Sequence, residues 1–221
     1  MGKDSGYRAA MIKKISGKLR SFLLFGPGAL VRRFLPRRMP ANAGNKIFVH
    51  IGCGDQDDAG YVNIDARAGW HIHKVGTIEE VRRVLGDNRA DLIYCCHIIE
   101  HVSHQKLLST LVGVRAALKQ GGILRLSVPD FSVIARMYEA RHSVEDVISP
   151  LMGGQGYADN FHRSVFDKEY LTGLLLKSGF SLVRPWDPAE IDGWKFDDWA
   201  SRTFPLYGIQ WKISLNLEAV K

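Results

Sequence analysis

The chain contains few cysteines, and their number and spacing give no sign of a disulfide framework. Of its 221 residues three are cysteines, Cys53, Cys95 and Cys96, and no two of them form a CxxC pair. Cys95 and Cys96 lie in an apolar stretch of the sequence. We therefore expect reduced cysteines in the core of a cytoplasmic protein.

Long apolar runs are also lacking. The most apolar window, residues 22–31, is interrupted by Gly26-Pro27-Gly28 and is too short to span a bilayer, which takes about 20 apolar residues. A secretory signal fits poorly, because four arginines separate this window from Ala41-Asn42-Ala43, which resembles a cleavage site. The sequence thus predicts no membrane span.

Beyond its first 40 residues the chain has no excess of basic charge. Residues 1–40 hold ten Lys or Arg and one Asp, a net charge of +9 within the overall +7, and the remainder has 20 basic and 22 acidic residues, a net charge of −2. The length and the 46% hydrophobic content predict one domain with a sizeable core. Its near-neutral charge argues against nucleic-acid binding by the domain.

The basic excess belongs to an N-terminal arm. Within residues 7–25, apolar side chains recur at helical spacing with basic residues between them, which is typical of a short amphipathic helix. This helix predicts either a peripheral contact with anionic lipid at the inner face of the membrane or a solvated helix packed on the domain, and the second interpretation is preferred. Pro36, Pro40 and residues 41–44 are typical of a linker. We therefore divide the chain into an arm and linker, residues 1–44, and a domain, residues 45–221.

The domain is organised around the stretch IFVHIGCGDQDDAGYVNID, from Ile47 to Asp65. It predicts a buried strand, a glycine turn at Gly52-Cys53-Gly54, a polar loop and a second strand that ends in an acid. Glycines there let a ligand approach the main chain, and the Asp65 carboxylate can accept hydrogen bonds from both hydroxyls of a ribose. The glycine turn and Asp65 therefore predict a cofactor that contains adenosine. A dinucleotide fits worse, because the GxGxxG pattern needs a glycine where Asp57 stands.

The motifs VHIGCGD, NID, ADLIYCCHIIEHV and ALKQGGILRLSVPD follow one another in this order. From about Lys46 to Lys221 the sequence resembles the class I S-adenosylmethionine-dependent methyltransferases, and especially a small bacterial group often associated with surface-polysaccharide biosynthesis. The resemblance implies an α/β fold with a doubly wound, mostly parallel Rossmann-like sheet, S-adenosylmethionine as cofactor, and O-methylation of a sugar or glycan intermediate. It implies cofactor contacts at His50, Gly52, Cys53, Gly54, Asp65, Ala66, Cys96 and His97.

The sequence departs from the family pattern in three places. His50 stands where the family often has an acid that reaches the methionine amino group, which leaves that contact open. Gly76-Thr77 stands where an acid often holds the adenine, so we expect backbone groups to read the adenine. Residues 53–60, between the first two strands, are too few for the usual crossover helix, and we expect an irregular loop.

The rest of the domain predicts alternating strands and helices. Expected strands cover residues 71–75, 91–96, 123–128, 180–184 and 209–220, and expected helices cover residues 78–85, 104–119 (with Ser103 as cap), 130–141 and 167–178. Two long loops, residues 153–162 and 185–208, are the expected acceptor-binding segments. The second contains Trp186, Trp194 and Trp199, whose aromatic faces suit a sugar or another flat acceptor.

Three histidines are candidates for the chemistry. Methyl transfer to a hydroxyl requires aligned reactants and a base, and histidine has a pKa near working pH. His97 and His101 follow the fourth strand, and His162 lies in the first long loop. We predict His162 or His101 as the base and a mainly main-chain contact to the cofactor at His97. Each could instead hold a loop by a hydrogen bond.

The segment from His97 to His101 also matches HxxEH, a zinc-protease pattern, but its place after a buried parallel strand argues against a protease. Glu100-His101 and the later His162 resemble the metal ligands of small-RNA 2′-O-methyltransferases, with His97 in place of a first Glu. This substitution favours softer divalent ions than magnesium. A divalent metal is an open alternative, not the favoured interpretation, and we assign no metal ligands.

Two alternative functions remain open at the level of sequence. The acceptor could be a small phenolic or amine metabolite, because tryptophans do not separate it from a sugar. The domain could also be a catalytically inactive binding module that recruits partners through its basic arm. Retained affinity for the cofactor separates an enzyme from such a module.

Overall fold

The computed structural model describes residues 37–40, 45–156, 160–191 and 196–221. The predicted amphipathic helix of residues 7–25, its lipid contact and Trp194 lie outside the described residues. No helix within the described ranges is long and apolar enough to cross a bilayer.

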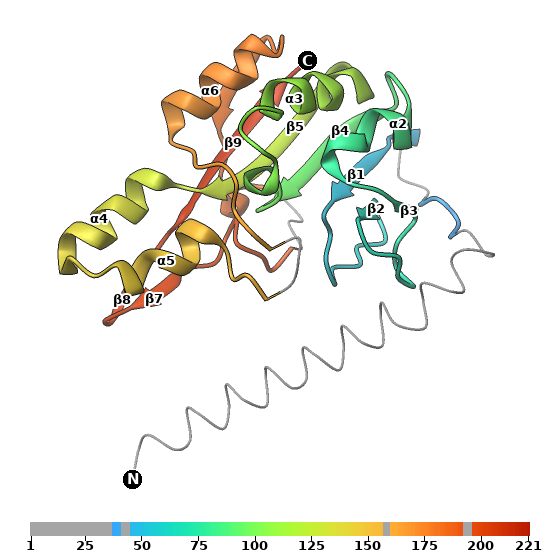
Figure 1. Ribbon diagram of the computed structural model, residues 1–221. Coiled ribbons are helices and arrows are strands. Elements are labelled where there is room, and N and C mark those ends of the chain that lie inside the picture. Colours follow the sequence, from blue (N-terminus) through green and yellow to red (C-terminus); the bar gives the residue numbers. More distant parts are fainter. Residues whose placement is uncertain (1–36, 41–44, 157–159, 192–195) are drawn as a thin grey trace.

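A seven-stranded sheet forms the centre of the domain, in the order β3-β2-β1-β4-β5-β9-β6 (Figure 1). β9 runs antiparallel to both of its neighbours, β5 and β6, and the other adjacent strands pair in parallel. A separate hairpin joins β7 to β8. The strands are β1 (Phe48–Ile51), β2 (Tyr61–Asp65), β3 (Lys74–Val75), β4 (Ala90–Cys96), β5 (Leu118–Pro129), β6 (Leu182–Pro185), β7 (Phe204–Leu206), β8 (Ile209–Trp211) and β9 (Ser214–Val220).

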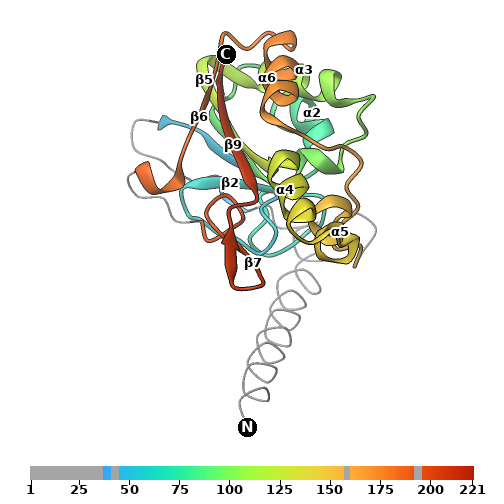
Figure 2. The ribbon, with the colours of Figure 1, turned by 90° about the vertical axis from the view of Figure 1, so that its left-hand side faces the viewer.

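The helices gather on one side of this sheet (Figure 2). They are α2 (Val81–Leu85), α3 (Leu107–Ala117), α4 (Phe131–Arg141), α5 (Val144–Met152) and α6 (Lys168–Lys177). The predicted fold class, a mostly parallel Rossmann-like sheet with flanking helices, is confirmed.

The main core fills the space between the sheet and these helices. On α3, Leu107, Leu111 and Val114 follow the helical spacing and are fully buried against apolar side chains of the strands. Burial of each such side chain contributes about 1.5–3 kcal/mol to folding. The core therefore fixes where the strands end, and with them the site.

An aromatic layer covers the opposite face of the sheet within the described residues. Phe196 stacks on Tyr94, with ring centroids 5.0 Å apart, and meets the ring of His50 edge-on at 4.5 Å. The Tyr94 hydroxyl donates a hydrogen bond of 2.6 Å to Asp198. The indole of Trp186 donates to the carbonyl of Leu126 at 3.3 Å. The second long loop thus packs on the sheet.

The connection from β1 to β2 contains no helix, as predicted. Residues 52–60 join the two parallel strands directly, and Gly52 and Gly54 both have positive φ, +66° and +57°. Such angles strain any residue with a side chain. The turn is closed by hydrogen bonds from the Gln56 amide to the Cys53 carbonyl and from the Tyr61 amide to the Asp58 carbonyl.

Three predicted elements have different bounds in the structure. The helix expected from residue 104 starts at Leu107, and Ser103 does not cap it: its carbonyl accepts from the amide of Lys106, so the two residues close a turn. The predicted boundary at Gly121-Gly122 was wrong, because backbone hydrogen bonds to Lys221 keep both glycines within β5. The third strand is short, because the carbonyl of His71 bonds to side chains and not to the strand ladder.

Two features of the second half were missed. α5 was predicted as neither helix nor strand, and it contains Pro150 in its last turn. The expected single strand of residues 209–220 is broken at Lys212 and Ile213, so that β8 pairs with β7 and β9 enters the central sheet. Ile213 is buried against α4 and α5 in a second small core, which accounts for the break.

Candidate active site

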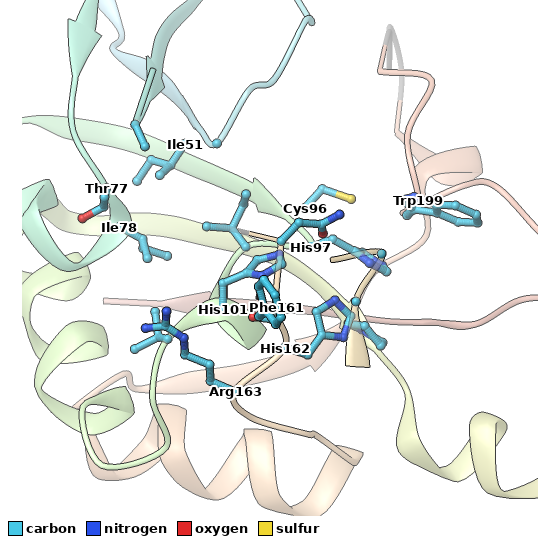
Figure 3. Close-up of a pocket in the computed structure, with 18 of the residues that line it drawn as sticks. Ile51, Thr77, Ile78, Cys96, His97, His101, Phe161, His162, Arg163 and Trp199 are labelled. Atoms are coloured by element: carbon cyan, nitrogen blue, oxygen red, sulfur yellow. Dashed lines mark hydrogen bonds between the residues drawn. The ribbon is translucent and has the colours of Figure 1, made fainter. Parts of the chain in front are cut away.

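A cavity of about 600 Å³ opens at the carboxyl ends of the parallel strands. This is the place where open α/β sheets bind their ligands. In Figure 3, Thr77 and Ile78 lie at one end, Trp199 lies at the other, and His97, His101 and His162 lie between them. The turn after β1, the ends of β2 and β4, and both long loops contribute to its wall.

Gly52 begins the wall after β1. Its amide donates to the carbonyl of Ile64 at 2.8 Å, which holds the turn against β2. A Cβ at this position would collide with the side chain of Ile98, which also lines the cavity. The glycine is therefore required by packing as well as by its positive φ.

Asp65 lies in the wall at the end of β2, with its side chain 8% exposed. One carboxylate oxygen accepts a hydrogen bond from the amide of Gly54 at 3.0 Å. The other accepts from the amide and the Nε of Arg67, at 2.9 and 3.2 Å. A carboxylate has about four acceptor sites, so it retains capacity for a ligand hydroxyl, and more if the weaker contact to Nε opens.

The segment after β3 forms the neighbouring wall, where Gly76, Thr77 and Ile78 line the cavity. The amide of Thr77 donates to the carboxylate of Glu80 at 3.2 Å, which fixes the start of the following turn. The amide of Gly76 donates to the carbonyl of Asp65. Of the two acidic residues in this turn, Glu79 lines the cavity and Glu80 does not.

His97 follows β4 in the left-handed region, with φ of +52°. This backbone conformation is uncommon for a residue with a side chain, and strain of this kind gathers at functional sites. The Nε2 atom lies 2.8 Å from the hydroxyl of Ser214, and that hydroxyl donates its proton to the carbonyl of Trp199 at 2.7 Å. A hydroxyl has one proton, so it accepts the second bond, and Nε2 of His97 is the protonated ring nitrogen.

Glu100 is buried behind the histidines, with its side chain 1% exposed. Its Oε1 lies 3.4 Å from Nδ1 of His97 and 3.9 Å from Nε2 of His162, but neither carboxylate oxygen accepts a hydrogen bond from the residues that the structure describes. Burial raises the pKa of Glu100 to about 8. Burial, followed by the nearby His162 and His101, lowers the pKa of His97 to about 3, so this imidazole is neutral.

His101 and His162 face one another across the cavity wall, with ring centroids 5.1 Å apart. Nδ1 of His101 lies 3.1 Å from the carbonyl of Phe161. The carbonyl of Glu100 accepts from the amides of Arg163 and Ser164, which ties the loop with His162 to the turn with His101. Burial, followed by the charge of His101, lowers the pKa of His162, which keeps that ring neutral as well.

Comparison with known proteins assigns the family. The pattern of a family described as "Methyltransferase domain" matches residues 24–184, more than half of the chain. The chain belongs to this family. A comparison with curated proteins finds no match.

Two solved structures are similar to this methyltransferase. An S-adenosylmethionine-dependent methyltransferase from Thermotoga maritima, described as a possible histamine N-methyltransferase, is 17% identical over 96% of each chain, with a TM-score of 0.50. An S-adenosylmethionine-dependent methyltransferase from Archaeoglobus fulgidus is 16% identical over 88% of this chain and 92% of its own, with a TM-score of 0.47. At 17% identity, the likeness to the first structure speaks for the fold alone.

The methyltransferase brings most of the predicted site residues together. The predicted site residues that line the cavity are Gly52, Asp65, Ala66, Cys96, His97, His101 and His162. His50, Cys53 and Gly54 are not among them. His50 lies under Phe196, and burial, followed by the charge of His71, lowers its pKa to about 3. Cys53 is buried, and burial, followed by the charge of Asp65, raises the pKa of its thiol far above the usual range.

The long loops divide between the cavity and the sheet. From the first, Gly153, Gly154 and Phe161 line the cavity beside His162, and from the second Trp199 does so, whereas Trp186 does not. Sequence reasoning missed Phe204, Ile213 and Ser214, because nothing local marks residues that reach the site across the sheet. The hydrogen bond between Ser214 and His97 spans 117 residues.

The cavity fits S-adenosylmethionine, the cofactor of this enzyme class. The acceptor capacity of the Asp65 carboxylate suits a ribose, and the glycine turn allows close approach of a ligand to the main chain. The cofactor has no phosphate, which agrees with a site formed by strand ends and not by the N-terminus of a helix.

Proposed function

We propose that this methyltransferase transfers the methyl group of S-adenosylmethionine to a hydroxyl of a sugar or glycan intermediate. The observation that supports a hydroxyl acceptor is the group of neutral imidazoles around Glu100, in the same cavity as Asp65 and the glycine turn. Neutral imidazoles accept protons, and a hydroxyl must lose its proton when it is methylated.

The chain's own residues hold and orient the reactants. Asp65 would accept hydrogen bonds from the ribose, with Ala66 and the segment after β3 next to the adenosine. The main chain at Cys96 and His97 would contact the methionine part. The cofactor supplies a methyl group on a positively charged sulfur.

The transfer is a displacement. The hydroxyl oxygen forms the new bond to the methyl carbon, and the bond from carbon to sulfur breaks with its electron pair on sulfur, which leaves a neutral thioether. The hydroxyl proton goes to a ring nitrogen of His162 or His101. Both residues line the cavity, and the burial that lowers the pKa of His162 keeps that ring deprotonated at neutral pH.

The sugar or glycan part of the proposal is supported by the sequence resemblance and by the aromatic wall. Trp199 lies at the end of the cavity away from Thr77 (Figure 3), and Phe161 and Phe204 also line the cavity. Aromatic faces pack well against the apolar faces of sugar rings, and they also suit phenols. The experiment must therefore include both classes.

The test is a methyl-transfer assay with S-adenosylmethionine labelled in its methyl group and three acceptor panels: sugars and oligosaccharides, phenols, and amines. We expect label in a sugar-containing product with the wild type and with His104→Ala, which changes an exposed histidine outside the cluster. We expect a loss of about 10²–10⁴-fold with His162→Ala or His101→Ala, whichever is the base. Label confined to phenols or amines overturns the glycan acceptor, and cofactor binding without transfer to any panel supports a binding module.

A further inference from the structure

We propose that Glu100, His101 and His162 bind a divalent transition-metal ion at the acceptor end of the cavity. Each residue offers one ligand atom, and these atoms lie within 4.8 Å of one another. The role of the ion in catalysis rests on the proposed function, whereas the binding site itself does not.

The buried carboxylate is the first reason. The side chain of Glu100 is 1% exposed, and its two oxygens accept no hydrogen bond from the described residues. A buried charge without partners is costly, and buried carboxylates are normally paired or bound to a metal. A cation shared with the two histidines supplies the missing partner.

The position of His97 is the second reason. Because Ser214 donates its proton to Trp199, Nε2 of His97 carries the ring proton and Nδ1 presents a lone pair to Oε1 of Glu100 at 3.4 Å. Two acceptor atoms at this distance repel one another unless a proton or a cation lies near them. A cation bound by Oε1 of Glu100 would relieve this repulsion.

The orientation of the proposed ligands is the third reason. The carbonyl of Phe161 is an acceptor, so Nδ1 of His101 carries the proton and Nε2 is the basic nitrogen of that ring. Histidines that bind metals commonly donate their other N–H to a backbone carbonyl in this way. The amides of Arg163 and Ser164 bond to the carbonyl of Glu100 and so hold the loop ligand, His162, next to the two ligands on the turn.

The ligand set selects the class of ion. Two imidazoles and one carboxylate suit zinc, iron, cobalt or nickel better than magnesium or calcium. Oε1 of Glu100 and Nε2 of His162 lie 3.9 Å apart, farther than two ligand atoms of one tetrahedral zinc ion, which lie about 3.4 Å apart. Side-chain movements of about 1 Å would bring the ligand atoms into place.

An ion held by three protein ligands leaves a position open. His101 and His162 line the cavity (Figure 3), so the open position would be accessible to an acceptor bound in the cavity. A hydroxyl bound there loses its proton near neutral pH. The proton then passes to water. With the ion bound, His101 and His162 are its ligands, and this step replaces the transfer to a histidine base given under the proposed function.

The test uses the full chain, treated with a chelator and then titrated with Co²⁺ by visible absorption and with Zn²⁺ by calorimetry. We expect one ion per chain with the wild type. Glu100→Gln, which removes the charge and keeps the shape, and His162→Ala should each weaken binding at least roughly tenfold. His104→Ala, three residues beyond His101 and exposed, should bind as the wild type does.

Cofactor binding, measured on the metal-free chain, separates this inference from the proposed function. A wild type that binds S-adenosylmethionine but gives neither cobalt absorption nor zinc heat overturns the metal site and leaves the proposed function standing. Equal metal affinity of Glu100→Gln and His104→Ala, both shown to be folded by thermal melting, also overturns it. Metal binding without cofactor binding would support the site and overturn the proposed function.

Discussion

The side chain of Ile98 fills the space in front of Gly52, so the turn after β1 is shaped by a residue that follows β4. Both residues line the cavity, and Gly52 has φ of +66°. We expect Gly52→Ala to displace Ile98 and to lower the free energy of unfolding by about 2–4 kcal/mol, since strain and overpacking add. Thermal melting and calorimetric titration of the cofactor measure the two effects.

Gly54→Ala is the matched control for this prediction. Gly54 also has positive φ, +57°, but no heavy atom lies within 4 Å of the position that its Cβ would take. It should lose about 1–2 kcal/mol from backbone strain alone. Equal losses in the two variants would show that the contact with Ile98 is unimportant.

The hydrogen bonds of Glu218 to two arginines predict that the free energy of unfolding falls at acid pH. Its carboxylate, on strand β9 of the seven-stranded sheet, accepts hydrogen bonds from Arg125 at 2.9 Å and Arg184 at 2.7 Å. Burial raises its pKa, but the bonds from the two arginines outweigh burial, and the pKa in the folded state is lowered. The carboxylate therefore stabilises the fold above its unfolded pKa, and this stabilisation is lost as pH falls through the folded value.

We expect Glu218→Gln to lower the free energy of unfolding by about 2 kcal/mol at pH 7. This is less than the 3–5 kcal/mol of a fully buried pair, because the Arg184 side chain is 58% exposed. Denaturant unfolding at pH 7 and at acid pH gives the comparison. The difference between wild type and variant should shrink below pH 4.5, and a difference independent of pH would contradict the account.

Trp199 should affect the acceptor more than the cofactor. It lies at the end of the cavity away from Thr77, and its carbonyl accepts from Ser214 through the main chain, which a substitution keeps. We expect Trp199→Ala to raise the KM of the acceptor several-fold and to leave the affinity for S-adenosylmethionine within about twofold, because packing contacts alone are removed. Trp186→Ala, on the opposite face of the sheet, should leave the acceptor KM unchanged. If Trp199→Ala lowers the affinity for S-adenosylmethionine and leaves the acceptor KM unchanged, Trp199 contacts the cofactor and not the acceptor.

The proposal that the N-terminal arm contacts a membrane rests on the sequence alone. Residues 1–40 hold ten basic side chains, and each can contribute up to about 1 kcal/mol of attraction to an anionic surface. If the arm contacts anionic lipid, which is the alternative to a helix packed on the domain, the full chain should co-sediment with vesicles containing phosphatidylserine, and less so at high salt. A chain lacking residues 1–40 should stay in solution, and equal sedimentation of the two chains would rule out the arm as the contact.

Local patterns in the sequence predicted the first two strands and the glycine turn between them. The strand from Phe48, the glycine turn and Asp65 are neighbours along the chain, so their geometry depends on the backbone preferences of a short stretch. The helix that Asp167 caps was also predicted correctly, because a capping side chain and apolar spacing are local signals.

The acceptor end depends on contacts that no local pattern reveals. No local pattern marks Glu100 as buried, but its side chain is 1% exposed, and the amides of Arg163 and Ser164, more than 50 residues away, bond to its carbonyl. The partner of His97 is Ser214, on the last strand. α5 was missed because Pro150 marks a break in most helices, whereas here the helix contains it and ends two residues later, at Met152.

Asp65 carries the central claim that S-adenosylmethionine binds at the ends of β1 and β2. The carboxylate lines the cavity and retains acceptor capacity. We expect Asp65→Ala to weaken the binding of S-adenosylmethionine roughly tenfold or more, because hydrogen bonds to a charged group contribute about 1.5–3 kcal/mol. Asp87→Ala, which removes an exposed carboxylate paired with Arg82, should bind as the wild type does.

The most direct measurement is calorimetric titration of S-adenosylmethionine into the wild type, Asp65→Ala and Asp87→Ala. We expect saturable binding to the wild type and to Asp87→Ala, and weaker binding to Asp65→Ala, each shown to be folded by thermal melting. Equal affinity of Asp65→Ala and the wild type would contradict the assigned cofactor site, and no binding to the folded wild type would contradict the proposed enzyme activity.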